Sequence, residues 1–207
     1  WKIKYYKGLG TSTPEESKEY FRELKIITYY WDDVSGEVID MAFNKKRSDD
    51  RKDWIQAYDG RVMDLGQTRI TFTDFINVDL IQFSIASNIR SIPNIIDGFK
   101  PSLRKVLYCC IKRNLTDECK VAQLAGYVGE HSAYHHGDTS LQGTIVGMAQ
   151  DFPNSNNINL LEPIGQFGSR ADGGKDSASP RYIFTSLSPI TSKIFKKVDD
   201  ALLKHVE

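Results

Sequence analysis

Two helical patterns separated by a short polar turn constrain the fold of this 207-residue chain more than any other feature. Apolar residues recur at helical spacing over about residues 120–129 and 139–150, and the connection HSAYHHGD (131–138) lies between them. After Pro153 the pattern changes to short strand-like stretches, at 159–161 and 181–187, among long glycine-rich loops. A helix-turn-helix followed by a β hairpin is the arrangement of a winged helix. The second half of the chain is therefore predicted to be an α+β winged helix with a β wing.

The first half of the chain predicts a smaller α/β region. Thr13 is a good N-cap, Pro14 suits the first helical position, and Glu15 and Glu16 suit the positive end of a helix dipole. The polar stretch around residues 32–36 is typical of a loop. In chain order, the pattern predicts a strand at 3–6, helices at 14–25 and 49–58, a short strand near 70–72 and a helix at 74–86.

Charge is balanced over the whole chain but uneven along it. The 27 basic and 27 acidic residues give a formal net charge of zero, which excludes a bulk polycation. Residues 88–113, however, hold six basic residues and one acidic residue, a local net charge of +5. A helix beginning at Pro101 would bury its apolar residues and send the neighbouring basic side chains outward. We expect a polyanion to bind in this stretch.

Apolar runs and cysteines exclude two further classes of protein. No apolar run approaches the ~20 residues that a membrane helix needs, so no membrane partner is expected. The three cysteines, Cys109, Cys110 and Cys119, follow no metal-ligand spacing. They are predicted to be reduced thiols in the core.

Two short motifs each allow a functional and a structural interpretation. The string Lys7-Gly8-Leu9-Gly10-Thr11 could approach a phosphate closely, although glycine turns beside a lysine are just as often structural. In Tyr134-His135-His136-Gly137-Asp138, adjacent histidines seldom point at one ion, and no further ligand lies at zinc spacing. The better functional interpretation is a histidine that donates to a phosphate oxygen or carries a proton. The alternative is a turn histidine that satisfies backbone groups.

Arg181-Tyr182 follows the polar glycine-rich loop, at the foot of the predicted wing. Most tyrosines in strands are core or cross-strand partners. A tyrosine nucleophile would need nearby positive charge, because a phenol is almost wholly protonated at neutral pH. The adjacent arginine offers a fixed fork of donors for the phosphate under attack. Composition alone does not choose between the two interpretations.

Taken together, these stretches resemble the breakage-reunion region of a type IIA DNA topoisomerase of the eukaryotic or viral type. The matching strings follow the family's order along nearly the whole chain. They are YYKGLGTS (5–12), AFNKKRSDDRK (42–52), DFIN (74–77), NIRSIPNIIDGFKP (88–101), KVAQLAGYV (120–128), YHHGD (134–138), GQFGSR (165–170) and GGKDSASPRYIFT (173–185).

The resemblance implies a role for each candidate residue. Tyr182 would be the nucleophile, Arg181 would stabilise the transition state, and Arg90 and His136 would help to hold the scissile phosphate. The predicted contacts with the DNA are Lys7, Lys45, Lys46, Lys100, Tyr134, Ser140 and Lys175. Residues 1–60 would be the C-terminal part of a Toprim domain, 61–79 a connector and 80–207 the winged-helix DNA-binding and cleavage domain. A tower domain is expected beyond Glu207.

The resemblance also implies the reaction and its partners. In an ATP-dependent type II topoisomerase, the tyrosine would form a 5′-phosphotyrosyl link, a second duplex would pass through the double-strand break, and the break would be religated. The partners would be double-stranded DNA and a second copy of the protein. The Mg²⁺ ligands and the ATPase domain are expected outside this chain, so no metal ligand is predicted within it, and alone it would be inactive. The location would be the nucleus for a cellular eukaryotic protein, and the host cytoplasm or viral factory for a viral one. The alternatives are a catalytically silent winged-helix DNA-binding module, or a protein of the bacterial gyrase or topoisomerase IV type.

Overall fold

The computed structural model describes residue 4, residues 10–64 and residues 66–203. It divides between Ser87 and Asn88 into two compact units. The predicted strand at 3–6 and the predicted DNA contact Lys7 lie outside the described residues, apart from Lys4. The domain boundaries predicted after residues 60 and 79 stay predictions.

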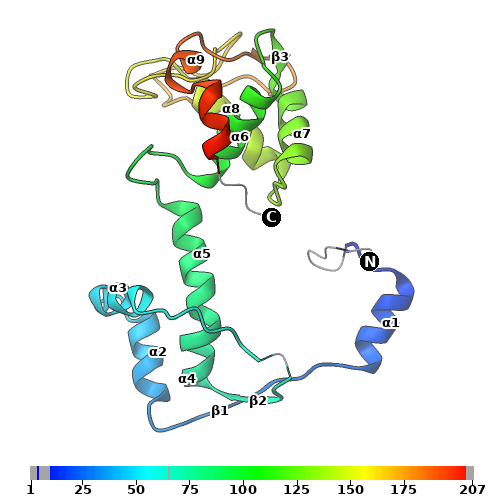
Figure 1. The fold of residues 1–207 in the computed structure, drawn as a ribbon, viewed down its shortest axis with the longest axis vertical. Coiled ribbons are helices and arrows are strands. Elements are labelled where there is room, and N and C mark those ends of the chain that lie inside the picture. The colour runs from blue at the N-terminus through cyan, green and yellow to red at the C-terminus, as the bar shows by residue number, and fades with distance from the viewer. Residues whose placement is uncertain (1–3, 5–9, 65, 204–207) are drawn as a thin grey trace. The chain divides into compact units, whose positions relative to one another are not determined.

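The first unit contains mainly short helices and one pair of strands (Figure 1). Its elements are α1 (Pro14–Arg22), β1 (Thr28–Tyr30), α2 (Ser35–Phe43), α3 (Ser48–Gln56), β2 (Arg69–Thr71), α4 (Phe72–Asp74), the π-helical segment η1 (Phe75–Leu80) and α5 (Ile81–Ser91), which crosses the division. β1 and β2 pair in parallel. The predicted start of α1 is confirmed by a capping box, in which Thr13 Oγ1 accepts from Glu16 N at 3.2 Å and Glu16 Oε2 accepts from Thr13 N at 2.7 Å.

The loop predicted around residues 32–36 is wrong at its C-terminal end, because α2 begins at Ser35. The Ser35 hydroxyl donates to Asp32 Oδ1 at 2.7 Å and accepts from Asp32 N at 2.9 Å, and the Ser35 side chain is buried. Thr73 Oγ1 donates to the same carboxylate oxygen at 2.7 Å. These hydroxyls hold the pKa of Asp32 below its ordinary value. Polar residues that favour a turn in sequence are here satisfied by one another at the start of a helix.

The second unit is built on three helices that pack against one another (Figure 1). They are α6 (Pro101–Lys112), α7 (Val121–His131) and α8 (Asp138–Ala149), and α7 and α8 form the predicted helix-turn-helix. Val106 and Leu107 of α6 are buried, as the sequence predicts, and so are the predicted core cysteines Cys109 and Cys110. All three cysteines are free and buried, and burial raises the pKa of Cys110 to about 12.

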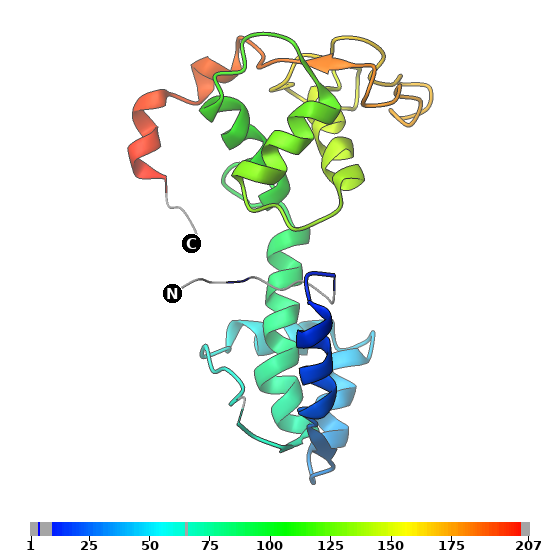
Figure 2. The same cartoon turned by 90° about the vertical axis from the view of Figure 1, so that its right-hand side faces the viewer.

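The wing consists of short pairings and long loops. β3 (Cys119–Lys120) pairs antiparallel with β4 (Phe184–Thr185), and single bridges join Leu161 to Leu187 and Ile164 to Phe184. Figure 2 shows the yellow and orange loops that follow α8 gathered at one end of the helices. The strand predicted over 181–187 is therefore mostly irregular, and Arg181 and Tyr182 lie in a turn before β4. Two short helical segments follow, α9 (Thr191–Ile194) and the 3₁₀ helix η2 (Lys197–Leu202). No helix in the described part of the chain has the length and apolar character to cross a membrane.

Candidate active site

The turn that carries Arg181 and Tyr182 is attached to the beginning of α7 by its backbone. The first N–H groups of a helix have no partner within the helix, and α7 has no side-chain cap. Val121 N donates to Ile183 O, and Ala122 N donates to Pro180 O, each at 3.1 Å. The carbonyls on either side of the Arg181-Tyr182 pair therefore satisfy the end of the helix. This attachment fixes the backbone of the turn.

Within the turn, neighbouring side chains have opposite burial. Ile183 is only 2% exposed and belongs to the core cluster, whereas Tyr182 is 72% exposed. A backbone bond from Tyr182 N to Ser179 O, 2.8 Å long, closes the turn on its other side. The buried isoleucine and the two helix bonds hold the corner, so the phenol is presented at the surface on a fixed backbone.

Arg181 places a permanent positive charge beside the phenol. Arg181 is exposed, and its guanidinium carbon lies 5.8 Å from the centre of the Tyr182 ring. A cation at this distance is attracted to the ring. The planar guanidinium also keeps N–H donors for a phosphate, to which it can bind with two parallel hydrogen bonds. An exposed hydroxyl beside a cation able to bind phosphate is the arrangement that attack on a phosphodiester would require.

The glycine-rich loop before this turn is held against the end of α8 by Gln150. Gln150 Nε2 donates to Phe167 O at 2.8 Å and to Gly174 O at 3.2 Å. Gly168 and Gly174 have φ angles of +100° and +80°, and a Cβ on Gly168 would lie 2.6 Å from Gly174 Cα. Only glycine fits such a close approach of two backbones. The sequence does not single out Gln150, because nothing local distinguishes it from any other polar residue at the end of a helix.

Lys175 and the beginning of α8 line a common cavity. The cavity, of about 350 Å³, lies between α8 and the glycine-rich loop, with Thr139, Lys175 and Pro180 in its wall. Ser140, the next residue along α8, is exposed. One predicted DNA contact, Lys175, thus lines the same cavity as Pro180, the residue that precedes the Arg181-Tyr182 pair.

The YHHGD turn is organised by a lysine from α6. Lys105 Nζ donates to Ala133 O at 2.9 Å and lies 6.0 Å from the centre of the Tyr134 ring. The Tyr134 ring meets the His136 ring edge to face at 5.4 Å. Lys105, one of the basic residues predicted to face outward, is half-buried and bonded to the backbone just before the turn. The turn residue Ala133 has a φ of +46°.

The basic stretch 88–113 is less available to a ligand than its sequence charge suggests. Arg104 binds Asp97 through two nitrogens, with a closest approach of 2.7 Å, and Lys105 is bonded as above. Arg90, in α5, is exposed, and Lys100 is half-buried at the N-cap of α6. Among the described residues, no three His, Cys, Asp or Glu side chains lie close enough together to hold a metal ion.

The remaining predicted DNA contacts, Lys45 and Lys46, belong to the first unit. Both are exposed in the short connection between α2 and α3. Of the predicted site residues, the structure thus brings Arg181 close to the Tyr182 ring and His136 into contact with the Tyr134 ring. That Arg90, His136, Arg181 and Tyr182 share one phosphate stays a prediction.

Two known family models match the sequence of this chain. Residues 90–207, which include the whole turn at Tyr182, match the family model for the A-type subunit of DNA gyrase/topoisomerase IV. Residues 1–88 match the C-terminal associated domain of TOPRIM. The chain belongs to the type II DNA topoisomerases. Its resemblance to that family and its mixed α/β and winged-helix fold are therefore confirmed.

Individual type II topoisomerases match along the entire chain. DNA topoisomerase 2 of Plasmodium falciparum is 57% identical and that of Saccharomyces cerevisiae 55% identical, each over 211 aligned residues and 100% of this chain. The crystal structure of the P. falciparum topoisomerase II DNA-binding, cleavage and re-ligation domain aligns to this chain with a TM-score of 0.86. The alignment covers 100% of this chain and 29% of the crystallised chain. These matches favour the eukaryotic type over the bacterial alternative. The chain spans about 15% of the length of the two curated relatives.

Proposed function

We propose that this chain is part of the DNA breakage-reunion core of an ATP-dependent type II topoisomerase, with Tyr182 as its nucleophile. The observation that carries the proposal is the exposed Tyr182 beside Arg181, on a turn whose two ends are bonded to the N-terminus of α7. A tyrosine in the core could not reach a duplex. This one can, and a cation accompanies it.

The reaction is an exchange of phosphoesters. Tyr182 Oη loses its proton and attacks a backbone phosphorus, and the new O–P bond forms as the bond from phosphorus to the 3′ oxygen breaks. The 5′ end stays on the tyrosine and the 3′ oxygen takes up a proton. One phosphoester replaces another, so resealing needs no external energy. Arg181, Arg90 and His136 would donate to the non-bridging oxygens, where negative charge concentrates in the transition state.

DNA would be held by backbone contacts rather than by base recognition. Lys175 and Ser140 would contact it from the unit that carries Tyr182, and Lys45 and Lys46 from the other unit. Tyr134, Lys100 and Lys7 complete the proposed set. Because binding of this kind releases counterions, affinity should fall steeply with salt and depend little on sequence.

Cofactors and assembly are proposed from the family. Mg²⁺ and ATP are general to type II topoisomerases, and the family resemblance gives neither of them a ligand within this chain. We assign both groups to residues outside this chain. Cutting both strands of a duplex needs two copies of the nucleophile, so we propose a symmetric homodimer. The place of action would be the nucleus in a cellular eukaryote, or the host cytoplasm or viral factory for a viral enzyme.

Replacing the hydroxyl tests the nucleophile. In the full-length enzyme, Tyr182→Phe should abolish the covalent protein–DNA adduct while its affinity for duplex DNA stays within about twofold, because the ring and Arg181 remain. The adduct is measured as labelled DNA that stays with the protein on a denaturing gel. Tyr20→Phe, which removes an exposed hydroxyl from α1, is the matched control and should form the adduct normally. An adduct in Tyr182→Phe would assign the chemistry to another residue. A silent DNA-binding module would form none in any variant.

A further inference from the structure

The connection between α2 and α3 presents two lysines from a segment with no net charge. Residues 37–53 contain five basic and five acidic residues. A neutral segment attracts DNA only where its charges are separated in space, with the carboxylates held away from the exposed cations. The arrangement of the other charges around Lys45 and Lys46 therefore decides whether this connection can bind a polyanion.

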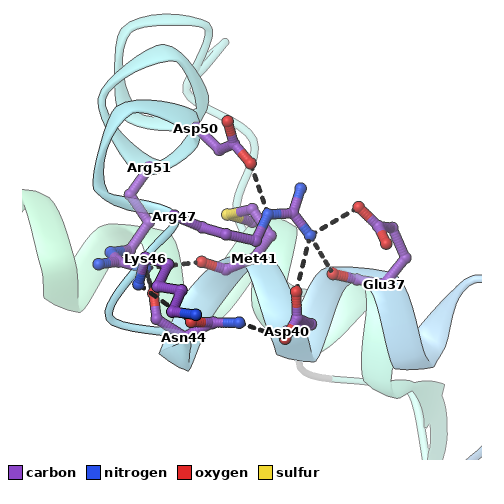
Figure 3. A network of polar contacts seen from close by, with 8 residues as sticks. All are labelled: Glu37, Asp40, Met41, Asn44, Lys46, Arg47, Asp50 and Arg51. Carbon is purple, nitrogen blue, oxygen red and sulfur yellow. Dashed lines mark hydrogen bonds and ion pairs between the residues drawn. The ribbon is translucent and has the colours of Figure 1, made fainter.

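Arg47 gathers three of the five carboxylates. Its guanidinium forms ion pairs with Glu37 at 2.6 Å and with Asp40 at 3.2 Å, both in α2 (Figure 3). It also pairs with Asp50 in α3, and so links α2 to α3. The Arg47 side chain is only 24% exposed, whereas its partners are 49–69% exposed. These contacts raise the pKa of Arg47. Arg47 is thus engaged within the protein and is not presented to a ligand.

Neighbouring bonds fix the backbone that carries the lysines. Arg51 Nη1 donates to Met41 O at 2.9 Å and to Asn44 O at 2.7 Å, which satisfies carbonyls at the end of α2 (Figure 3). Asn44 Oδ1 accepts from Lys46 N at 3.0 Å, and Asn44 O accepts from Arg47 N at 3.0 Å. The backbone of residues 44–47 is therefore held on both sides.

From this geometry we propose that Arg47 is a positioning residue for DNA binding, which acts through Lys45 and Lys46 and does not touch DNA itself. It clamps α2 to α3 and draws Glu37, Asp40 and Asp50 together, and the connection then presents only its two lysines. The inference rests on the proposed function, since it takes Lys45 and Lys46 as contacts with the phosphate backbone. It adds a residue to which the family resemblance gave no role.

Arginine is needed here because of its shape. A guanidinium presents five N–H donors in a fixed plane and can bridge several carboxylates at once, whereas a lysine ammonium is a single compact charge on a flexible stem. Arg47→Lys should therefore keep the net charge but lose the bridge. A role in charge alone would survive that substitution.

The test is a double-mutant cycle on the full-length enzyme, with duplex DNA binding measured by fluorescence anisotropy over a range of salt concentrations. Lys45→Gln/Lys46→Gln should weaken binding by about tenfold or more at low salt and lower the slope of log K against log salt by about 1.8, two contacts at about 0.9 each. Arg47→Gln should weaken binding to a similar extent. Adding Arg47→Gln to the lysine variant should cost less than about twofold, because residues that act through one another are not additive.

Lys52→Gln is the matched control for charge. Lys52 lies in α3, the helix that Arg47 precedes; it is 69% exposed and pairs with Asp49 at 2.6 Å, and its loss should change DNA affinity less than about twofold. Arg47→Lys covers the case in which Arg47→Gln does not fold. It should lose affinity although its charge is unchanged, with folding verified by circular dichroism.

The outcomes separate this inference from the proposed function. If the affinity losses of Arg47→Gln and Lys45→Gln/Lys46→Gln were additive, or if adding Arg47→Gln to the lysine variant lowered the salt slope further, Arg47 itself would contact DNA. Either result would overturn this inference and leave the proposed function intact. So would full affinity in Arg47→Lys, or a Lys52→Gln loss equal to that of Arg47→Gln. Unchanged binding by Lys45→Gln/Lys46→Gln would remove the DNA contact and the inference with it. The nucleophile would be untouched, because the Tyr182→Phe adduct assay reports on it separately.

Discussion

Two exposed corners of this chain present side chains that we propose act on DNA, and different interactions hold the two corners. The corner at Tyr182 depends on a buried isoleucine and on backbone carbonyls that bond to the start of α7. At the corner of Lys45 and Lys46, Arg51 and Asn44 bond to the backbone, and Arg47 adds ion pairs with carboxylates that are about half exposed or more. Apolar burial and backbone bonds respond little to salt, whereas ion pairs near the surface are screened by it.

The difference in support fits the role that we propose for each corner. A nucleophile must be held close to its attack geometry, and a misplacement of about 1 Å can cost roughly a hundredfold in rate. A lysine that meets a phosphate has a long, flexible stem and works at a distance through its charge. Rigid support is therefore needed under Tyr182, and separation of charge is sufficient around Lys45 and Lys46.

The largest expected effect tests the apolar support of the first corner. Ile183→Ala should destabilise the protein by about 2–4 kcal/mol, because it opens a cavity in the core where the side chain is 2% exposed. Urea unfolding measures the loss, which should be nearly the same at low and high salt. The adduct yield of the folded enzyme should also fall.

A matched change at the surface sharpens that comparison. Ile95→Ala removes the same atoms from a side chain that is 99% exposed, and it should change stability by less than about 0.5 kcal/mol. If Ile183→Ala cost no more than this control, the corner at Tyr182 would not depend on burial, and the contrast between the two corners would fail.

The next largest effect tests the glycine-rich loop beside the same corner. Gly168→Ala should cost on the order of 1–3 kcal/mol, since φ is +100° and the new Cβ would lie 2.6 Å from Gly174 Cα. Adduct formation should fall more than DNA affinity, because the loop leads into the turn of Tyr182. Gly137→Ala is the control, since its φ is −64° and no atom lies within 4 Å of a Cβ placed there. Equal losses in adduct yield and affinity in Gly168→Ala would show that the loop holds DNA and does not support the nucleophile.

Sequence reasoning predicted the helices of the second unit because their signals are local and strongly periodic. The buried faces of α6, α7 and α8 follow from apolar spacing. The start of α1 was also local, since Thr13 and Glu16 stand at capping-box spacing.

What the sequence could not predict depends on contacts between distant residues. Ser35 begins a helix because Asp32 and Thr73 complete its hydrogen bonds, and Thr73 lies 41 residues from Asp32. Lys105 looks like any exposed basic residue until Ala133, 28 residues away, provides a carbonyl for it. The role of Gln150 likewise depends on a loop 17 and 24 residues further along.

The smallest expected effect concerns the pH dependence of stability. It tests whether that dependence is set by the type of contact or by the unit that contains the contact. Asp97 and Arg104 form a charge-held contact inside the unit that is otherwise held by its apolar core. Hydrogen bonds from Arg104 hold the pKa of Asp97 below its ordinary value of 3.8. The folded state therefore prefers the carboxylate, so its contribution is complete above that pH and is lost as the pH falls below it.

Arg104→Gln removes the ion pair and keeps the bond from Phe99 N to Asp97 Oδ1. Because both side chains are more than one third exposed, we expect a loss of only about 0.5 kcal/mol at pH 7 in low salt. The difference in melting temperature between wild type and variant should shrink below pH 4, and also in 0.5 M salt, whereas the Ile183→Ala difference should change with neither. A deficit in Arg104→Gln that persisted at pH 3 would mean that the guanidinium stabilises α6 by packing. The response to pH and salt would then not separate contacts held by charge from contacts held by apolar burial.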